Sequence, residues 1–141
     1  MDTRTKRLRV ALIYDAVYPY TLGGVEHRNH ALALCWKDRL SVSFYGFAYW
    51  NDSPAKQLPG CRYVSIGAAR PLHNASGKRR ISDALLAAVG VGRALWFSED
   101  DVWEIANIPH IPVIAAWVVS RLRRRPLIVT WHEFFGPFWD E

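Results

Sequence analysis

The sequence contains little cysteine and no long hydrophobic run. Cys35 and Cys61 are the two cysteines in 141 residues, and their spacing matches no metal-binding motif. No apolar stretch approaches the roughly 20 residues that a membrane-spanning helix needs. A strand-like run follows the basic N-terminus with no small-residue cleavage site, so we expect no signal peptide. These absences together favour a reduced, cytoplasmic protein.

Two nucleotide-binding fingerprints are also missing. The sequence contains neither the G-x-G-x-x-G pattern of dinucleotide-binding domains nor the G-x-x-x-x-G-K-[ST] pattern of a phosphate-binding loop. A nucleotide-dependent oxidoreductase is therefore disfavoured, although a domain of that general fold is not.

What the sequence does contain is the composition of one globular domain. Its length suits a single α/β domain, half of its residues are hydrophobic and 22% are charged. The net charge is +5, and basic residues gather at 6–9, 78–80 and 121–125. Such clusters can hold phosphates, anionic lipid or nucleic acid. For each cluster taken singly we favour the simpler interpretation of a solvated face or a helix end.

Apolar strand-like runs alternate with helix-like segments along the whole chain. The pattern predicts strands at residues 8–14, 40–47, 61–66, 101–106 and 126–131. It predicts helices at 25–37, at 79–97, and from Pro109–Pro112 to about Arg124. This alternation indicates βαβ units, and hence an α/β fold with a Rossmann-like, open, mostly parallel sheet flanked by helices.

Polar residues follow three of the predicted strands, where an open parallel sheet binds its ligands. Asp15 follows the first strand, Asn107 and His110 follow the fourth, and His132 and Glu133 follow the fifth. We expect these side chains to meet at one edge of the sheet. His132 is the strongest chemical candidate, because a histidine there can donate to a phosphate or sugar hydroxyl, or transfer a proton near neutral pH.

The pair Gly23-Gly24 precedes a predicted helix. Two glycines let the backbone approach a ligand and adopt positive φ, and the free N–H groups of the following helix suit a phosphate. An ordinary tight turn is the alternative. Glu26 lies in the first helical turn, either as a ligand-binding group or as an acid favoured by the helix dipole. His27 and His30 share a helix face, but without a recognisable third ligand we expect no metal site.

These segments resemble family 4 glycosyltransferases of the GT-B type. The stretch at 9–24 (RVALIYDAVYPYTLGG) is similar to the family's first strand and glycine loop, and continues as its G-G-x-E. Residues 78–82 (KRRIS) resemble a basic segment that opens a helix in one subgroup. Residues 129–139 (VTWHEFFGPFW) resemble the T-W-H-E-x-x-G-x-x-W stretch of bacterial and archaeal members. A Lys37–Val42 segment replaces the usual G-H-E-V, which we interpret as a changed turn.

The resemblance implies a retaining transferase that moves a sugar from a nucleotide-sugar donor to a glycan or lipid-linked acceptor, with a UDP- or GDP-sugar as substrate and neither metal nor cofactor. Residues 1–141 would be the N-terminal, acceptor-side domain. The C-terminal domain, which binds most of the donor in this family, would be absent, so this half alone should be inactive. Gly23 and Gly24 would approach the donor pyrophosphate, and His132 would contact the transferring sugar. Asp15, Glu26, Asn107, His110 and Glu133 are weaker candidates in the cleft.

A second hypothesis remains open. The chain could be a non-catalytic Rossmann-like module that binds a ligand or a partner chain. Basic clusters beside Trp96 and Trp117 would also suit a membrane-surface or lipid-linked acceptor. We therefore expect a cytoplasmic protein, with contact to the inner face of the membrane as a hypothesis, and no nucleic-acid partner.

Overall fold

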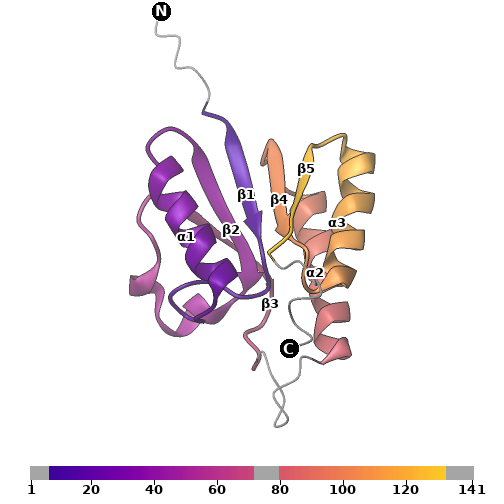
Figure 1. The fold of residues 1–141 in the computed structure, drawn as a ribbon, viewed down its shortest axis with the longest axis horizontal. Helices are drawn as coiled ribbons and strands as arrows, with labels where there is room; N and C mark the ends of the chain where they lie inside the picture. The colour runs from indigo at the N-terminus through magenta and orange to yellow at the C-terminus, as the bar shows by residue number, and fades with distance from the viewer. Residues whose placement is uncertain (1–6, 72–79, 133–141) are drawn as a thin grey trace, which may run out of the picture.

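Figure 1 shows the fold in a computed structural model, which describes residues 7–71 and 80–132. One parallel sheet has the strand order β3-β2-β1-β4-β5. Its strands are β1 (Arg9–Ile13), β2 (Ser41–Phe47), β3 (Arg62–Gly67), β4 (Val102–Ala106) and β5 (Leu127–Thr130). The order reverses between β1 and β4, which in an open α/β sheet is where the ligand crevice forms.

Helices cover both faces of this sheet. The helix α1 (Gly24–Trp36) lies on one face, and α2 (Ile81–Trp96) and α3 (His110–Arg123) lie side by side on the other. Each helix connects two parallel strands, as the alternating sequence pattern requires. The predicted α/β class with a Rossmann-like open parallel sheet is therefore confirmed.

The strands are buried on both faces, so they form two hydrophobic cores. The core beneath α2 and α3 includes Ile13, Tyr45, Leu95, Trp103 and Ile105. The core on the α1 side includes Leu12, Ala33, Val42, Phe44 and Trp50. Alternate residues of one strand serve opposite cores, as Leu12 and Ile13 do in β1, which explains why the strands are apolar throughout.

The connection between β2 and β3 differs from the predicted loop. The sequence predicts no helix between the strands at 40–47 and 61–66, but the structure contains two short 3-10 helices, η1 (Tyr49–Asp52) and η2 (Pro54–Lys56). Trp50 in η1 is buried against the α1-side core, where its ring contacts that of Tyr63 at 5.3 Å. A single large aromatic side chain therefore covers sheet surface that a crossover helix would otherwise cover.

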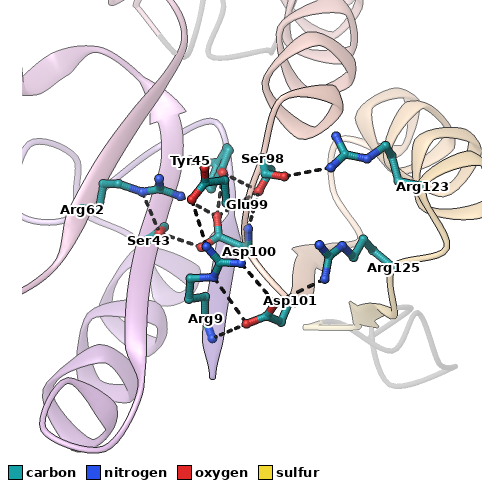
Figure 2. Close-up of polar contacts among 10 residues, drawn as sticks. All are labelled: Arg9, Ser43, Tyr45, Arg62, Ser98, Glu99, Asp100, Asp101, Arg123 and Arg125. Carbon is teal, nitrogen blue, oxygen red and sulfur yellow. Dashed lines mark hydrogen bonds and ion pairs between the residues drawn. The ribbon is translucent and has the colours of Figure 1, made fainter. Parts of the chain in front are cut away.

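A buried carboxylate organises the amino edge of the sheet (Figure 2). Asp100, in the loop before β4, is 1% exposed. It accepts hydrogen bonds from four side chains, those of Ser43 (3.0 Å), Tyr45 (2.6 Å), Arg62 (2.8 Å) and Ser98 (3.0 Å). These donors come from β2, β3 and the loop itself, so one carboxylate fixes the spacing of three segments.

Asp101 makes a second set of contacts at the same edge (Figure 2). Its carboxylate accepts from the backbone N–H of Arg9 at 3.0 Å and from the guanidinium of Arg125 at 3.2 Å. Asp101 thereby joins the start of β1 to the segment that leads into β5. The amino edge is therefore held by polar contacts within the protein.

The helices of the described residues do not resemble membrane spans. None of them is both long and apolar enough to cross a bilayer.

Candidate functional site

The carboxyl edge of the sheet brings three of the predicted residues together. Asn107 follows β4 and is 2% exposed. Its backbone N–H donates to the carbonyl oxygen of Thr130 at 3.0 Å, and its side-chain Oδ1 accepts from the backbone N–H of His132 at 3.4 Å. Nδ1 of His110 lies 2.6 Å from the carbonyl oxygen of Asn107. Asn107 therefore links the ends of β4 and β5 to the start of α3.

The Asn107 amide also has unused donor capacity. Its Nδ2 is buried and has no hydrogen-bond partner in the described part of the chain. A buried N–H group without a partner costs free energy, and it is a common sign of a missing ligand or water. This donor sits at the predicted binding edge.

His132 and His110 differ in their exposure. The His132 side chain is partly buried at the end of β5. His110 is exposed as the first residue of α3, and its ring lies 6.5 Å from the ring of Trp131. Both imidazoles are thus at the carboxyl edge, as predicted. Glu133, the other candidate in this segment, lies outside the described residues.

Gly23 and Gly24 lie at the start of α1, but their backbone conformation differs from the expected one. Gly23 is the N-cap with φ −171°, an extended conformation that any residue adopts, and Gly24 does not have positive φ either. The expectation of positive φ was wrong. What matters at Gly23 is space, because a Cβ there would lie 2.5 Å from Oε2 of Glu26.

At Gly24 the surroundings are open. A Cβ built there meets no atom within 4 Å, and the first N–H groups of a helix have no acceptor inside the helix. The first backbone bond of α1 runs from the N–H of His27 to the carbonyl oxygen of Gly23 at 3.1 Å. Gly24 is therefore exposed at the start of α1, where the helix dipole favours negative charge, while the Glu26 carboxylate lies beside Gly23 at the same helix start.

Glu26 is more enclosed than its place in a first helical turn suggests. Its side chain packs over Gly23, and the residue is 5% exposed. In the described part of the chain its carboxylate makes no ion pair. A buried acid close to the N–H groups of a helix start is stabilised by the helix dipole, so the structure favours the dipole interpretation over direct ligand binding.

Asp15 lies near the reversal of strand order. It is largely buried at the end of β1, and its carbonyl oxygen accepts from the N–H of Phe47 at 3.2 Å. Its side chain lines a small depression together with Tyr49, Arg70 and Pro109. Asp15 is thus at the predicted edge, on the side of β2 rather than of β5.

Sequence reasoning missed a polar triad that ties α1 to the other half of the sheet. Arg28 donates to Oε1 of Glu104 at 2.6 Å, and the hydroxyl of Thr130 donates to the same oxygen at 2.7 Å. Glu104 lies in β4 and is buried. The only signal for it in the sequence was a carboxylate inside an otherwise apolar strand. This triad anchors α1 over β4 and β5, near His132.

The histidines of α1 form an aromatic cluster rather than a metal site. The ring of Tyr18 lies 4.5 Å from that of His27 and 4.6 Å from that of His30. Burial lowers the pKa of His30, and the neighbouring His27 lowers that pKa further. Among the described residues no three His, Cys, Asp or Glu side chains are grouped so that they could hold a metal ion.

No protein-family model matches the chain, and no curated protein sequence matches it. The functional argument therefore depends on the fold and on the geometry of the carboxyl edge.

Proposed function

We propose that this chain is the acceptor-side, N-terminal domain of a retaining GT-B glycosyltransferase resembling family 4. The observation that carries the proposal is that two features both lie at the carboxyl edge of the sheet. One is the open N-terminus of α1 at Gly24, and the other is the group of Asn107, His110 and His132 at the ends of β4 and β5.

Each part has a chemical role in this proposal. The diphosphate of a UDP- or GDP-sugar approaches the N–H groups beside Gly24, where a helix dipole favours negative charge. His132 contacts the transferring sugar, and its imidazole can donate to a hydroxyl or phosphate oxygen. Nδ2 of Asn107 supplies a further buried donor. Asp15, Glu26, His110 and Glu133 remain candidates around the cleft, with Glu26 the weakest because it packs inward.

The proposal assigns most donor binding to a second domain. When a site is divided between two domains, each half contributes only part of the binding and transition-state stabilisation. We therefore expect this domain alone to bind nucleotide-sugar weakly and to turn over negligibly. The acceptor would be a glycan or a lipid-linked sugar.

Nuclear magnetic resonance tests the location of the site. UDP-glucose and GDP-mannose would be titrated into the isotopically labelled chain while backbone amide shifts are followed. We expect saturable shifts at Gly24, Asn107 and His132, and little change at the amino edge around Asp100.

Two alanine variants sharpen this test. Gly24→Ala adds a methyl group in open space, so the fold should persist, while the methyl group blocks the close approach of the diphosphate to the backbone and the affinity should fall by about tenfold. Gly92→Ala, in the middle of α2, is the matched control and should bind as the unmodified chain does. Absence of shifts with both donors, or shifts confined to another surface, would contradict the proposal and favour a non-catalytic binding module.

A further inference from the structure

The outer side of α3 exposes an unusual number of large apolar side chains. Trp117 is 57% exposed and Leu122 is 65% exposed, and Ile114 and Val118 are also exposed. Trp117 and Val118 lie three and four residues after Ile114, and Leu122 lies four residues after Val118, so these side chains form one stripe along the helix. The opposite side of α3, with Ala116 and Val119, packs into the core. The exposed stripe is therefore additional to what the fold needs.

The neighbouring helix α2 continues this apolar surface. Leu85, Val89 and Trp96 are exposed on it. The two helices lie directly against each other, because a Cβ at Gly92 of α2 would approach the Cβ of Ala115 in α3 to 4.0 Å. We call the exposed sides of these two helices the α2–α3 face. Contiguous apolar surface of this kind marks a contact site with another molecule or a membrane.

Cationic side chains are interleaved with these apolar groups. Arg93 in α2 and Arg121 and Arg124 at the end of α3 are exposed, and within the described chain their side chains make no ion pair. Arg121 and Arg124 also line a groove between α3 and β5, together with Trp117. The helix dipole explains why cations lie near a helix end, but not why they share the exposed stripe.

Negative charge is nearly absent from the same helices. Asp83 is the single acidic residue in α2 and α3, and its carboxylate pairs with Arg70 at 3.3 Å. The α2–α3 face is thus apolar and cationic. Trp, Leu and Ile beside Arg are the composition of surfaces that rest at the boundary between lipid headgroups and acyl chains.

We infer that the α2–α3 face docks on an anionic phospholipid surface. Lipid phosphates would contact Arg121 and Arg124 in the groove, while Trp117 and Leu122 enter the headgroup boundary. Charge argues against a second copy of the chain as the occupant, since a symmetric contact would join two cationic patches whose one acid, Asp83, already pairs with Arg70. This inference is independent of the proposed glycosyl transfer.

Vesicle co-sedimentation tests it. The chain would be mixed with vesicles of phosphatidylcholine alone, or of equal parts phosphatidylcholine and phosphatidylglycerol, at low and high salt. We expect binding to the anionic vesicles only, weakened by salt because ions screen the attraction. The double variant Arg121→Glu/Arg124→Glu should bind at least about 100-fold more weakly, given a few-fold loss for each unit of charge.

Matched controls separate the face from net charge and general hydrophobicity. Arg39→Glu/Lys56→Glu makes the same charge change at exposed positions outside the α2–α3 face and should bind nearly as the unmodified chain does. Trp117→Ser/Leu122→Ser should lose binding by about tenfold or more. The apolar control is the double variant Leu22→Ser/Leu34→Ser, which replaces two other exposed leucines. This variant should retain binding.

Other results would overturn the inference. Absence of binding to anionic vesicles would do so, as would equal losses in the face variants and their controls. Analytical ultracentrifugation provides a further check. Self-association that Trp117→Ser/Leu122→Ser abolishes, without any vesicle binding, would assign the face to a second copy of the chain instead.

Discussion

Asp100 is the most deeply buried carboxylate of the amino edge. Its carboxylate is buried and surrounded by donors, including the guanidinium of Arg62 and the hydroxyl of Tyr45. A buried charge is tolerated only when such partners are present, and removing one partner leaves the other uncompensated. The aspartate pair before β4 was not singled out from the sequence, because nothing in it shows which strands surround a loop.

Asp100→Asn should therefore lower the free energy of unfolding strongly. The amide has the right shape but accepts through one oxygen only, so the buried hydroxyls that donate to Asp100 lose a partner, and we expect a loss of about 1–3 kcal/mol. Urea denaturation measures it. The control is Asp38→Asn, whose exposed carboxylate lies 3.9 Å from Lys37 and should change stability by less than about 1 kcal/mol. Equal effects for the two variants would refute the structural role of Asp100.

Tyr45, which donates to Asp100, makes the stability of the fold depend on pH. Burial and the hydrogen bond to Asp100 raise the pKa of its phenol well above the ordinary value. The protonated phenol is therefore favoured in the folded state. Its contribution is complete below about pH 10, the ordinary tyrosine pKa, and is lost as the pH rises toward the folded-state pKa.

Stability should thus fall as the pH rises above about 10, the ordinary tyrosine pKa, and Tyr45→Phe should make that decline shallower. Denaturant unfolding at a series of pH values gives the slope. Burial also raises the pKa of Tyr63, so some slope should remain in the variant. An unchanged slope would show that Tyr45 ionises as freely in the folded chain as in the unfolded one.

At the scale of elements, sequence periodicity was sufficient for the strands and helices. The predicted boundaries agree with the observed ones to within two residues, for example 79–97 against Ile81–Trp96 for α2. Parallel strands buried on both faces are continuous apolar runs, which sequence alone reveals. The short helices η1 and η2 were missed, because turn-forming residues such as Pro54 do not distinguish a 3-10 turn from a loop.

The candidate site was predictable only in outline. Strand ends located Asn107, His110 and His132, since all parallel strands point to the same edge. The Arg28–Glu104–Thr130 triad was not predictable, because it depends on how α1 crosses the sheet and on the register of β4 with β5. Tertiary contacts of that kind leave no periodic trace in a sequence.

Two glycines inside α2 provide a test of helix packing. A Cβ at Gly90 would lie 1.8 Å from the carbonyl oxygen of Ile66, whereas one at Gly92 meets only Ala115 at an ordinary distance of 4.0 Å. Gly90→Ala should therefore destabilise the fold by several kcal/mol, because α2 must move away from β3. Gly92→Ala should be neutral or stabilise by up to about 1 kcal/mol, since alanine favours helix.

Thermal unfolding of the two variants decides this point. The account expects opposite signs for identical substitutions two residues apart in one helix. Destabilisation of both by the same amount would mean that α2 does not approach β3 as closely as described.

At the scale of the whole molecule, the three surfaces have different characters. The amino edge is closed by salt bridges and hydrogen bonds around Asp100 and Asp101, whereas the α2–α3 face is apolar and cationic. The carboxyl edge combines an open helix start with a buried, unused amide donor at Asn107. The proposed site is at the carboxyl edge, where open α/β sheets commonly bind ligands.

The most direct test of this account is nucleotide-sugar turnover by the protein together with its proposed donor-binding domain, and by the His132→Ala variant of that protein. UDP- and GDP-sugars labelled in the sugar would be supplied with lipid and glycan acceptors, and His27→Ala would serve as the histidine control. The account predicts sugar transfer that His132→Ala lowers by about 100-fold or more, the scale expected for a catalytic hydrogen-bonding or proton-transfer group. Full activity in His132→Ala, or no transfer and no binding with any donor, would contradict it.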